Sequence, residues 1–115
     1  MGQQMKAKFE EFNDGSVGIY TVNDDDKLEK AIPDGLRFGE ENVGITRHYA
    51  ARAADSRVDK VIHVLLNKSI QPHEVAVIDG EQYDIDKVDH IKDNMPPISK
   101  LTLISYEKHR KKEFA

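Results

Sequence analysis

Two of the three Asp-Gly steps, those at residues 14–15 and 79–80, constrain the fold of this 115-residue chain more than any other feature. An Asp-Gly pair supplies the positive φ that a tight hairpin turn needs. Apolar and polar residues alternate on both sides of each step, with the period of a half-buried strand. We therefore predict two antiparallel hairpins, in which residues 5–12 pair with 16–22 and residues 74–78 pair with the segment that follows.

The remaining apolar segments extend this β pattern. Residues 58–66 and 98–106 are rich in β-branched residues and leucine, which favours strands. In the first of these segments both alternating sets of side chains are apolar. We therefore expect cover on both of its faces, from the core on one side and from a helix or a second subunit on the other. Tyr83 should point into the core, and the break in alternation at Val88 indicates a β-bulge.

Residues 44–56 contain four alanines and place Ile45, Tyr49 and Arg52 at helical spacing, so we predict one helix there. The fold class that these elements predict is mainly β (α+β). We expect a small antiparallel barrel of about six strands, with one helix and a long loop after the first hairpin. The whole chain, residues 1–115, is expected to form a single domain.

The long loop is predicted over residues 23–42, which show little periodicity and include three consecutive aspartates. Connections of this length in compact domains are usually functional or disordered. At the other end of the chain, the basic composition of residues 107–115 indicates a flexible tail.

Composition argues against several classes of function. The formal net charge is −4, and outside residues 108–112 there is no basic cluster of the kind that neutralises phosphates, so nucleic-acid binding is not expected as the main role. The chain has no cysteine, which excludes disulfides and thiolate metal sites. No apolar run approaches the roughly 20 residues of a membrane helix, and the first residues lack the layout of a signal peptide. A soluble, cytoplasmic protein without membrane contact is expected.

The sequence shows no grouping of residues that is typical of catalysis. Its five histidines include no pair at the i, i+4 spacing of a helical zinc site. His63 lies within an apolar strand pattern, which favours a core or interface histidine over a metal ligand. Counted from Asp24, the sixth position of a calcium loop would be Glu29, where glycine is required. We expect no enzymatic activity, no catalytic or metal-binding residues and no cofactor.

Several segments in a fixed order resemble one family of proteins. They are Val43-Gly44-Ile45-x-Arg47-x-Tyr49-x-Ala51-x-Ala53, Val58-Asp59-Lys60-x-Ile62, Ile78-Asp79-Gly80-x-x-Tyr83-x-Ile85, Pro96-Pro97 and Leu101-x-Leu103. Over residues 37–106 the chain is similar to the small head-closure proteins, also called head–tail joining or stopper proteins, of tailed phages and phage-like prophage elements of Gram-positive bacteria. The resemblance implies a small β-barrel with one helix. Many members carry arginine where this chain has His63, so no role of that arginine is transferred.

The resemblance implies a structural role in the neck of the particle. Family members assemble as a ring between the portal and adaptor and the tail, where they close the DNA channel and dock the tail. In some members a loop between early strands projects into the channel, and residues 23–42 occupy the matching position here. The implied partners are the portal or adaptor protein, the tail-completion protein and further copies of the chain. DNA would pass or be retained nearby without sequence-specific binding. The implied location is the bacterial host cytoplasm during assembly and then the particle neck.

The long loop and the predicted helix supply the residues expected at a subunit or partner interface. These are Asp24, Asp25, Asp26, Leu36, Phe38, Arg47, His48 and Arg52. A second hypothesis uses the same β pattern and open loop. In that hypothesis the chain is a free-standing small β-barrel module in the cytoplasm that binds a protein or a small ligand.

Overall fold

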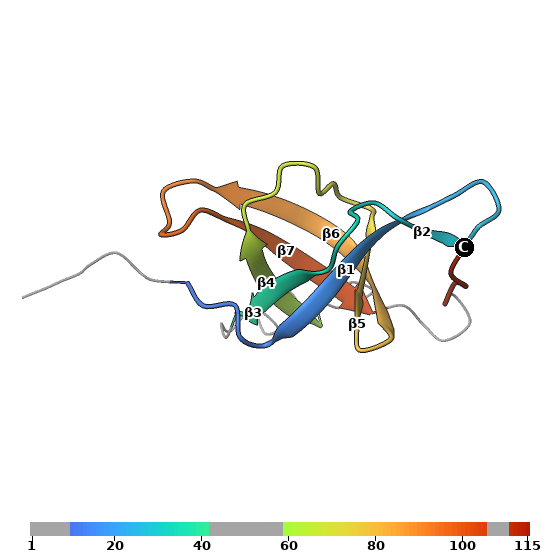
Figure 1. Cartoon of the computed structure of the whole chain (residues 1–115), viewed down its shortest axis with the longest axis horizontal. Coiled ribbons are helices and arrows are strands. Elements are labelled where there is room, and N and C mark those ends of the chain that lie inside the picture. Colours follow the sequence, from blue (N-terminus) through green and yellow to red (C-terminus); the bar gives the residue numbers. More distant parts are fainter. Residues whose placement is uncertain (1–9, 42–58, 106–110) are drawn as a thin grey trace, which may run out of the picture.

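The computed structural model describes residues 10–41, 59–105 and 111–115, which form seven β-strands (Figure 1). In chain order the strands are β1 (Gly15–Val22), β2 (Leu28–Lys30), β3 (Leu36–Glu40), β4 (Lys60–Leu65), β5 (Val75–Ile78), β6 (Glu81–Ile91) and β7 (Ile98–Ser105). The helix predicted over residues 44–56 lies outside the described residues. Among the described residues, no helix is long and apolar enough to cross a membrane.

Six of the strands close into a small barrel. Their order is β1-β3-β4-β7-β6-β5, and β5 pairs with β1 to complete the circle. All of these pairings are antiparallel, which confirms the predicted antiparallel barrel. The β4–β7 and β6–β7 ladders are long, whereas β3 and β4 share only the pairs Gly39–His63 and Glu40–Ile62. The β3–β4 junction is therefore the shortest ladder of the barrel.

Aliphatic side chains fill the interior of the barrel. Ile62 and Val64 from β4 and Leu101 and Leu103 from β7 are completely buried in one cluster. Full burial of one such side chain contributes about 1.5–3 kcal/mol to folding. Tyr83 packs in the same cluster, which confirms its predicted inward orientation. On β4, four consecutive residues from position 61 to 64 are buried, as expected for a strand covered on both faces.

The second predicted hairpin is present. Asp79 and Gly80 both have positive φ, 51° and 81°, and they join Ile78 to its partner Glu81. Positive φ at both central residues is the requirement of a type I′ turn, whose twist matches that of the flanking strands. The β-bulge in β6 also exists, but the register shifts between residues 85 and 87 and not at position 88.

The first predicted hairpin is wrong. The described part of its first strand, residues 10–12, forms no strand, and the beginning of β1 pairs with β3 instead, with Gly15 opposite Phe38. The physical reason is that β3 offers more apolar side chains to the core than residues 10–12 do. β3 brings Phe38 into the core and Leu36 against it, whereas residues 10–12 carry two glutamates.

Residues 23–42 are not one long loop, because they contain β2 and β3. Beyond Tyr20, β1 leaves the barrel and pairs with β2 to form an arm, defined here as residues 20–30 (Figure 1). The tip of the arm is a tight turn in which Asn23 Oδ1 accepts hydrogen bonds from the backbone N–H groups of Asp25 and Lys27, at 2.9 and 3.0 Å. The segment predicted as a loop therefore has a defined structure.

The last five residues of the sequence pack along this arm. Leu28 N donates to Glu113 O and Ala115 N donates to Leu28 O, both at 2.8 Å. The ring of Phe114 lies edge-on to Tyr20, with 5.1 Å between centroids. These contacts cover the outer edge of β2, which protects it from pairing with another strand. For residues 111–115 they differ from the flexible tail that the sequence indicates over residues 107–115, and the rest of that range lies outside the described residues.

Candidate functional site

The β3–β4 junction is an incomplete seam in the barrel wall. Extending its register beyond the Gly39–His63 pair would set Arg37 opposite Leu65, but in the described part of the chain the ladder stops at Gly39. Figure 1 shows β3 and β4 close together near the end of β3 and separating toward its beginning. A strap of irregular chain covers one part of the opening, and the other part is an apolar pocket.

The strap, defined as residues 10–14, crosses the narrow part of the seam. Asp14 N donates a hydrogen bond to Phe38 O at 3.0 Å, and Arg37 Nε donates to Phe12 O at 3.1 Å. Both partners belong to β3, so the strap is held flat against that strand. The strap satisfies its polar backbone groups in this way without joining a sheet.

Gly39 makes room for the strap. A Cβ at this position would overlap the Glu11 carbonyl oxygen and would lie 2.5 Å from His63 Nε2. Glycine is therefore required here by the close approach of another segment of backbone, which is one of the established uses of this residue. The sequence position of this glycine fixes where the strap can cross β3.

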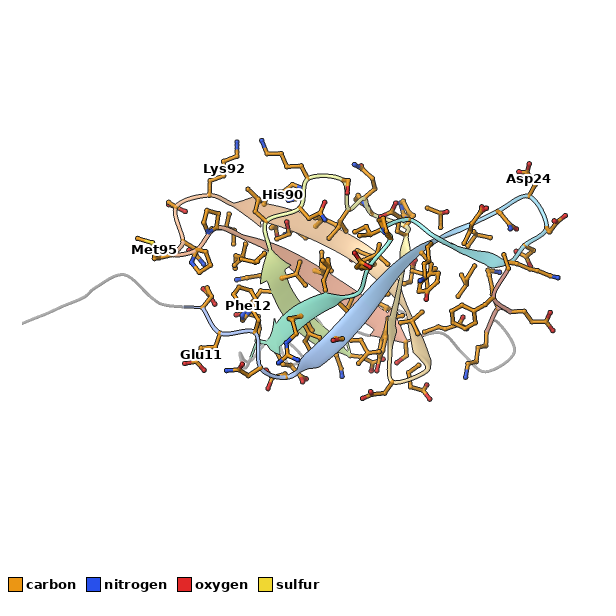
Figure 2. The ribbon with its side chains drawn as sticks, viewed as in Figure 1. Glu11, Phe12, Asp24, His90, Lys92 and Met95 are labelled. Carbon is orange, nitrogen blue, oxygen red and sulfur yellow. The ribbon has the colours of Figure 1, made fainter. Side chains whose placement is uncertain are left out.

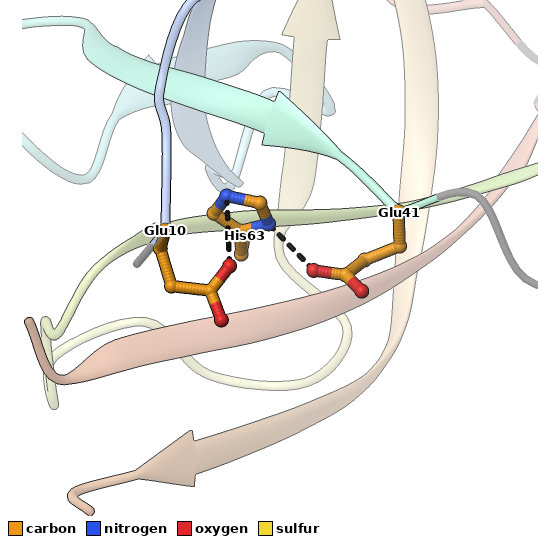
Figure 3. Close-up of side chains that lie close together, drawn as sticks. All are labelled: Glu10, Glu41 and His63. Carbon is orange, nitrogen blue, oxygen red and sulfur yellow. Dashed lines mark hydrogen bonds and ion pairs between the residues drawn. The ribbon is translucent and has the colours of Figure 1, made fainter. Parts of the chain in front are cut away.

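His63 joins the strap to both strands of the seam (Figure 3). Its Nε2 lies 2.7 Å from Glu11 O and 3.4 Å from Glu10 Oε1, and its Nδ1 lies 2.6 Å from Glu41 Oε2. Both ring nitrogens therefore face oxygen acceptors. The tautomer of the ring decides which of the two nitrogens carries the donated proton. The ring of Phe12 packs edge-on against His63, with centroids 5.3 Å apart.

The two glutamates of this cluster have further partners. Glu41 Oε1 lies 3.9 Å from Lys100 Nζ, and Glu10 Oε2 accepts a hydrogen bond from Asn94 Nδ2 at 2.6 Å. The glutamate side chains are only 8% and 3% exposed, respectively. A carboxylate removed from water costs several kcal/mol unless it is paired, so each of these contacts is needed to offset burial. Together they form a network that fastens the strap to the barrel.

The same side chains have the composition of a metal site, since ligand atoms of Glu10, Glu41 and His63 lie within 4.8 Å of one another. Imidazole and carboxylate are common ligands of divalent metal ions. The hydrogen bonds favour a different assignment. Each ring nitrogen already lies 2.6–2.7 Å from an oxygen atom, so a metal ion bound to the ring would have to separate the ring from the Glu11 carbonyl or from the Glu41 carboxylate. We assign the cluster as an ion-pair network that positions the strap.

Beside the strap, the open part of the seam forms an apolar pocket of about 260 Å³. The pocket is lined by Phe12, Gly35, Leu36, Arg37 and Leu65. Leu65 is 55% exposed, although the residues before it on β4 are buried. Within the described part of the chain, no carboxylate forms an ion pair with Arg37. The pocket thus presents apolar side chains and one cationic group to a contacting surface.

The residues predicted at an interface fall in different parts of the structure. The aspartates at positions 24, 25 and 26 are exposed at the tip of the arm, where Asp26 Oδ1 lies 3.0 Å from Lys112 Nζ. Leu36 lines the pocket together with Phe12, which Figure 2 shows toward the other end of the molecule from Asp24. Phe38 is 2% exposed and packs in the core cluster. Arg47, His48 and Arg52 lie outside the described residues.

Sequence reasoning identified Leu36 but missed the other residues of the pocket and the partners of His63. Its prediction of a buried or interface histidine is confirmed, since His63 is 6% exposed and hydrogen-bonded. No local sequence motif could reveal Glu10 and Glu41 as partners of His63, because both are distant from His63 in the chain. The one available signal was the glycine in β3, at the position where the strap crosses.

No protein-family model, curated protein or solved structure matches this chain. The features that bear on function are the strap, the pocket, the arm and the order of the sequence motifs. None of these features alone defines a class of protein.

Proposed function

We propose that this protein is a structural subunit of the neck of a phage or phage-like particle and that it is not an enzyme. In this proposal, copies of the chain form a ring between the portal and adaptor and the tail, close the DNA channel and provide a surface on which the tail docks. The order of the motifs over residues 37–106 supports the proposal. So does the small antiparallel barrel, which is the fold that the resemblance to head-closure proteins implies.

The observation that carries the proposal is the contrast between the polar and the apolar groups of the seam. The buried polar side chains of the network, Glu10, Glu41 and His63, contact one another and neighbouring side chains. They are held in place and are not aimed into the pocket, where acid–base chemistry would need them. The accessible features are an apolar pocket and an arm. Both are suited to contacts with other macromolecules, as a subunit with neighbours on different sides requires.

Deletion of the gene in the source strain, followed by electron microscopy of the particles, tests this proposal. A neck subunit that closes the head and docks the tail is needed for both steps. The deletion strain is therefore expected to produce heads that have lost DNA, together with unattached tails. Expression of the intact gene in trans should restore joined particles. Normally joined particles in the deletion strain would contradict the proposal.

The pocket favours a second candidate function, a free-standing module that binds a small ligand or a peptide. Its volume of about 260 Å³ lies just below the range of about 300–1,000 Å³ that is typical of ligand pockets. Gene neighbourhood separates the two candidates, because a neck subunit is expected to be encoded between capsid and tail genes. Micromolar binding of a specific small molecule by the lone monomer, from a locus without particle genes, would support the module.

A further inference from the structure

We propose that the arm of one copy of this protein occupies the seam pocket of a second copy, in a head-to-tail contact. The inference rests on the proposed ring for its biological setting and identifies the two surfaces that would build it. It commits to a second copy as the occupant because the chain carries the complementary surface itself.

The exposed large apolar side chains of the described residues fall into two groups. Val22 and Phe114 lie on the arm and are 40% and 49% exposed. Leu65 and Met95 lie beside the strap and are 55% and 54% exposed, and Met95 O accepts a hydrogen bond from the first residue of the strap. Each end of the molecule thus offers apolar area that a contact would remove from water, at about 25 cal/mol per Å².

Asp24 and Asp25 on the arm and Arg37 at the pocket carry opposite charges, while the exposed Glu11 and Asp34, next in the chain to Phe12 and Gly35 of the pocket lining, add negative charge there. Asp24 and Asp25 at the arm tip are exposed, and in the described part of the chain neither forms an ion pair with a lysine or arginine. Arg37 at the pocket has no carboxylate partner among the described residues. Opposite charges at the edge of an apolar contact steer association and fix its orientation. An arm tip placed beside Arg37 would supply the ion pair that Asp24, Asp25 and Arg37 lack among the described residues of a single copy.

The positions of the two surfaces require that the contact be made between copies. Figure 2 shows Asp24 at one end of the molecule, and Phe12 of the pocket lies toward the other end. An arm therefore does not reach the pocket of its own chain. Contacts that join two different faces of identical subunits produce a ring when the rotation between subunits closes. Hydrogen bonds between Leu28 and residues 113–115 hold the arm in shape, which lowers the entropy lost on docking.

Disulfide trapping tests the contact directly, because the chain has no cysteine of its own. Two differently tagged variants, Val22→Cys and Leu65→Cys, are mixed and oxidised mildly. Lys87→Cys replaces the second variant as a control, since its side chain on β6 is also exposed. The Val22–Leu65 heterodimer is expected to exceed the control by about tenfold, because docking raises the effective concentration of the two thiols. Equal yields would overturn the proposal, and so would a predominant Val22–Val22 product, which indicates a symmetric arm–arm contact.

Charge exchange provides a second test in the same assay. The variants Arg37→Glu and Asp24→Lys/Asp25→Lys, each introduced into both cysteine chains, are expected to lower the heterodimer yield about threefold. The yield should recover when Arg37→Glu is placed on the Leu65→Cys chain and the two lysines on the Val22→Cys chain. Yields that do not respond to either exchange would overturn the assigned contact. Circular dichroism of each variant shows whether the barrel is retained.

The outcomes separate this inference from the proposed function. A protein that labels the particle neck but forms no Val22–Leu65 disulfide overturns the arm–pocket contact and leaves the neck role in place. In that case the arm is free to face the channel or a different partner. A disulfide that forms efficiently in a protein absent from particles has the opposite meaning. It supports the contact between copies and contradicts the neck role.

Discussion

Gly39 and His63 face each other across the β3–β4 ladder so closely that a Cβ on Gly39 would lie 2.5 Å from His63 Nε2. The same atom would overlap the Glu11 carbonyl oxygen, which lies 2.7 Å from that nitrogen. Three segments that are distant in sequence therefore meet at one glycine. The strap can remain on the barrel only while this position carries no side chain.

Replacing Gly39 with alanine is expected to lower the free energy of unfolding by about 1–3 kcal/mol, because the added methyl group forces the strap or His63 to move. Urea denaturation measures the change. Gly35→Ala is the matched control, since a Cβ there would meet only Val17 O at an ordinary 3.6 Å. Equal losses for the two variants would show that the strap does not depend on the close approach.

His63→Ala is expected to destabilise the protein by about 3 kcal/mol or more, because it leaves the buried side chains of Glu10 and Glu41 without the ring nitrogens that they contact. The control is His90→Ala. His90 is exposed and bonds only to Ser99 Oγ, at 2.8 Å, so its loss should cost about 1 kcal/mol or less. A His63 variant as stable as the His90 variant would contradict the assigned network.

Lys68 and Lys92 form a pair of like charges on the surface. A side-chain hydrogen bond with Lys92, followed by the repulsion of its charge, lowers the pKa of Lys68 below its ordinary value. In the alkaline range between this lowered pKa and the unfolded value of about 10.4, the unfolded chain binds more protons. Stability is therefore expected to rise with pH through that range. At lower pH both amines are charged and their repulsion opposes folding.

The variant Lys92→Gln should raise the pKa of Lys68 toward its ordinary value, since it removes the neighbouring charge. A side-chain NMR titration of Lys68 measures the midpoint. Lys87→Gln serves as the control, because Lys87 Nζ lies 3.7 Å from Asp89 Oδ2 in a separate ion pair. An unchanged midpoint in the Lys92 variant would mean that the two amines are not neighbours in solution.

Tyr83→Ala is expected to cost about 3 kcal/mol, because the ring is 9% exposed within the core cluster and its removal leaves a cavity. Lys60 Nζ lies 5.4 Å from the ring centroid and would lose this contact as well. Tyr83→Phe keeps the ring and should cost less than about 1.5 kcal/mol. Chemical denaturation gives both values. A loss below about 0.5 kcal/mol for the alanine variant would place the ring on the outer face of β6.

The parts of the fold that local chemistry determines could be predicted from the sequence. The turn at Asp79 and Gly80 is specified by two adjacent residues that accept positive φ, and the alternation after it fixes which side of β6 faces inward. The apolar pattern of β4 likewise predicted burial on both faces. In each of these cases the information lies within a few neighbouring residues.

The first hairpin failed because an Asp-Gly step does not choose its partner strand. At Gly15 the competition was between residues 10–12 and β3, and the apolar residues of β3 decided it. β2 and β3 were missed because they are short and follow a polar turn. A connection of about 20 residues without structure should itself have argued against the loop, and Leu36 and Phe38 already show the alternation of a strand.

The seam could not be predicted, because its parts come from segments far apart in the chain. Nothing near His63 in the sequence indicates that Glu10 and Glu41 will be its partners. The pocket forms where the β3–β4 ladder ends, and the length of a ladder depends on how the whole barrel closes. The acidic residues of the arm are visible in the sequence, but their separation from Phe12 of the pocket appears only in three dimensions (Figure 2).

The central claim, that this protein is a structural subunit of a particle neck, is tested most directly by immunoelectron microscopy. Particles from the source strain are labelled with an antibody against the protein, and particles from the deletion strain serve as the control. The account predicts label confined to the head–tail junction. Particles without label, with the protein recovered free in the cytoplasm, would contradict the account and favour the free-standing binding module.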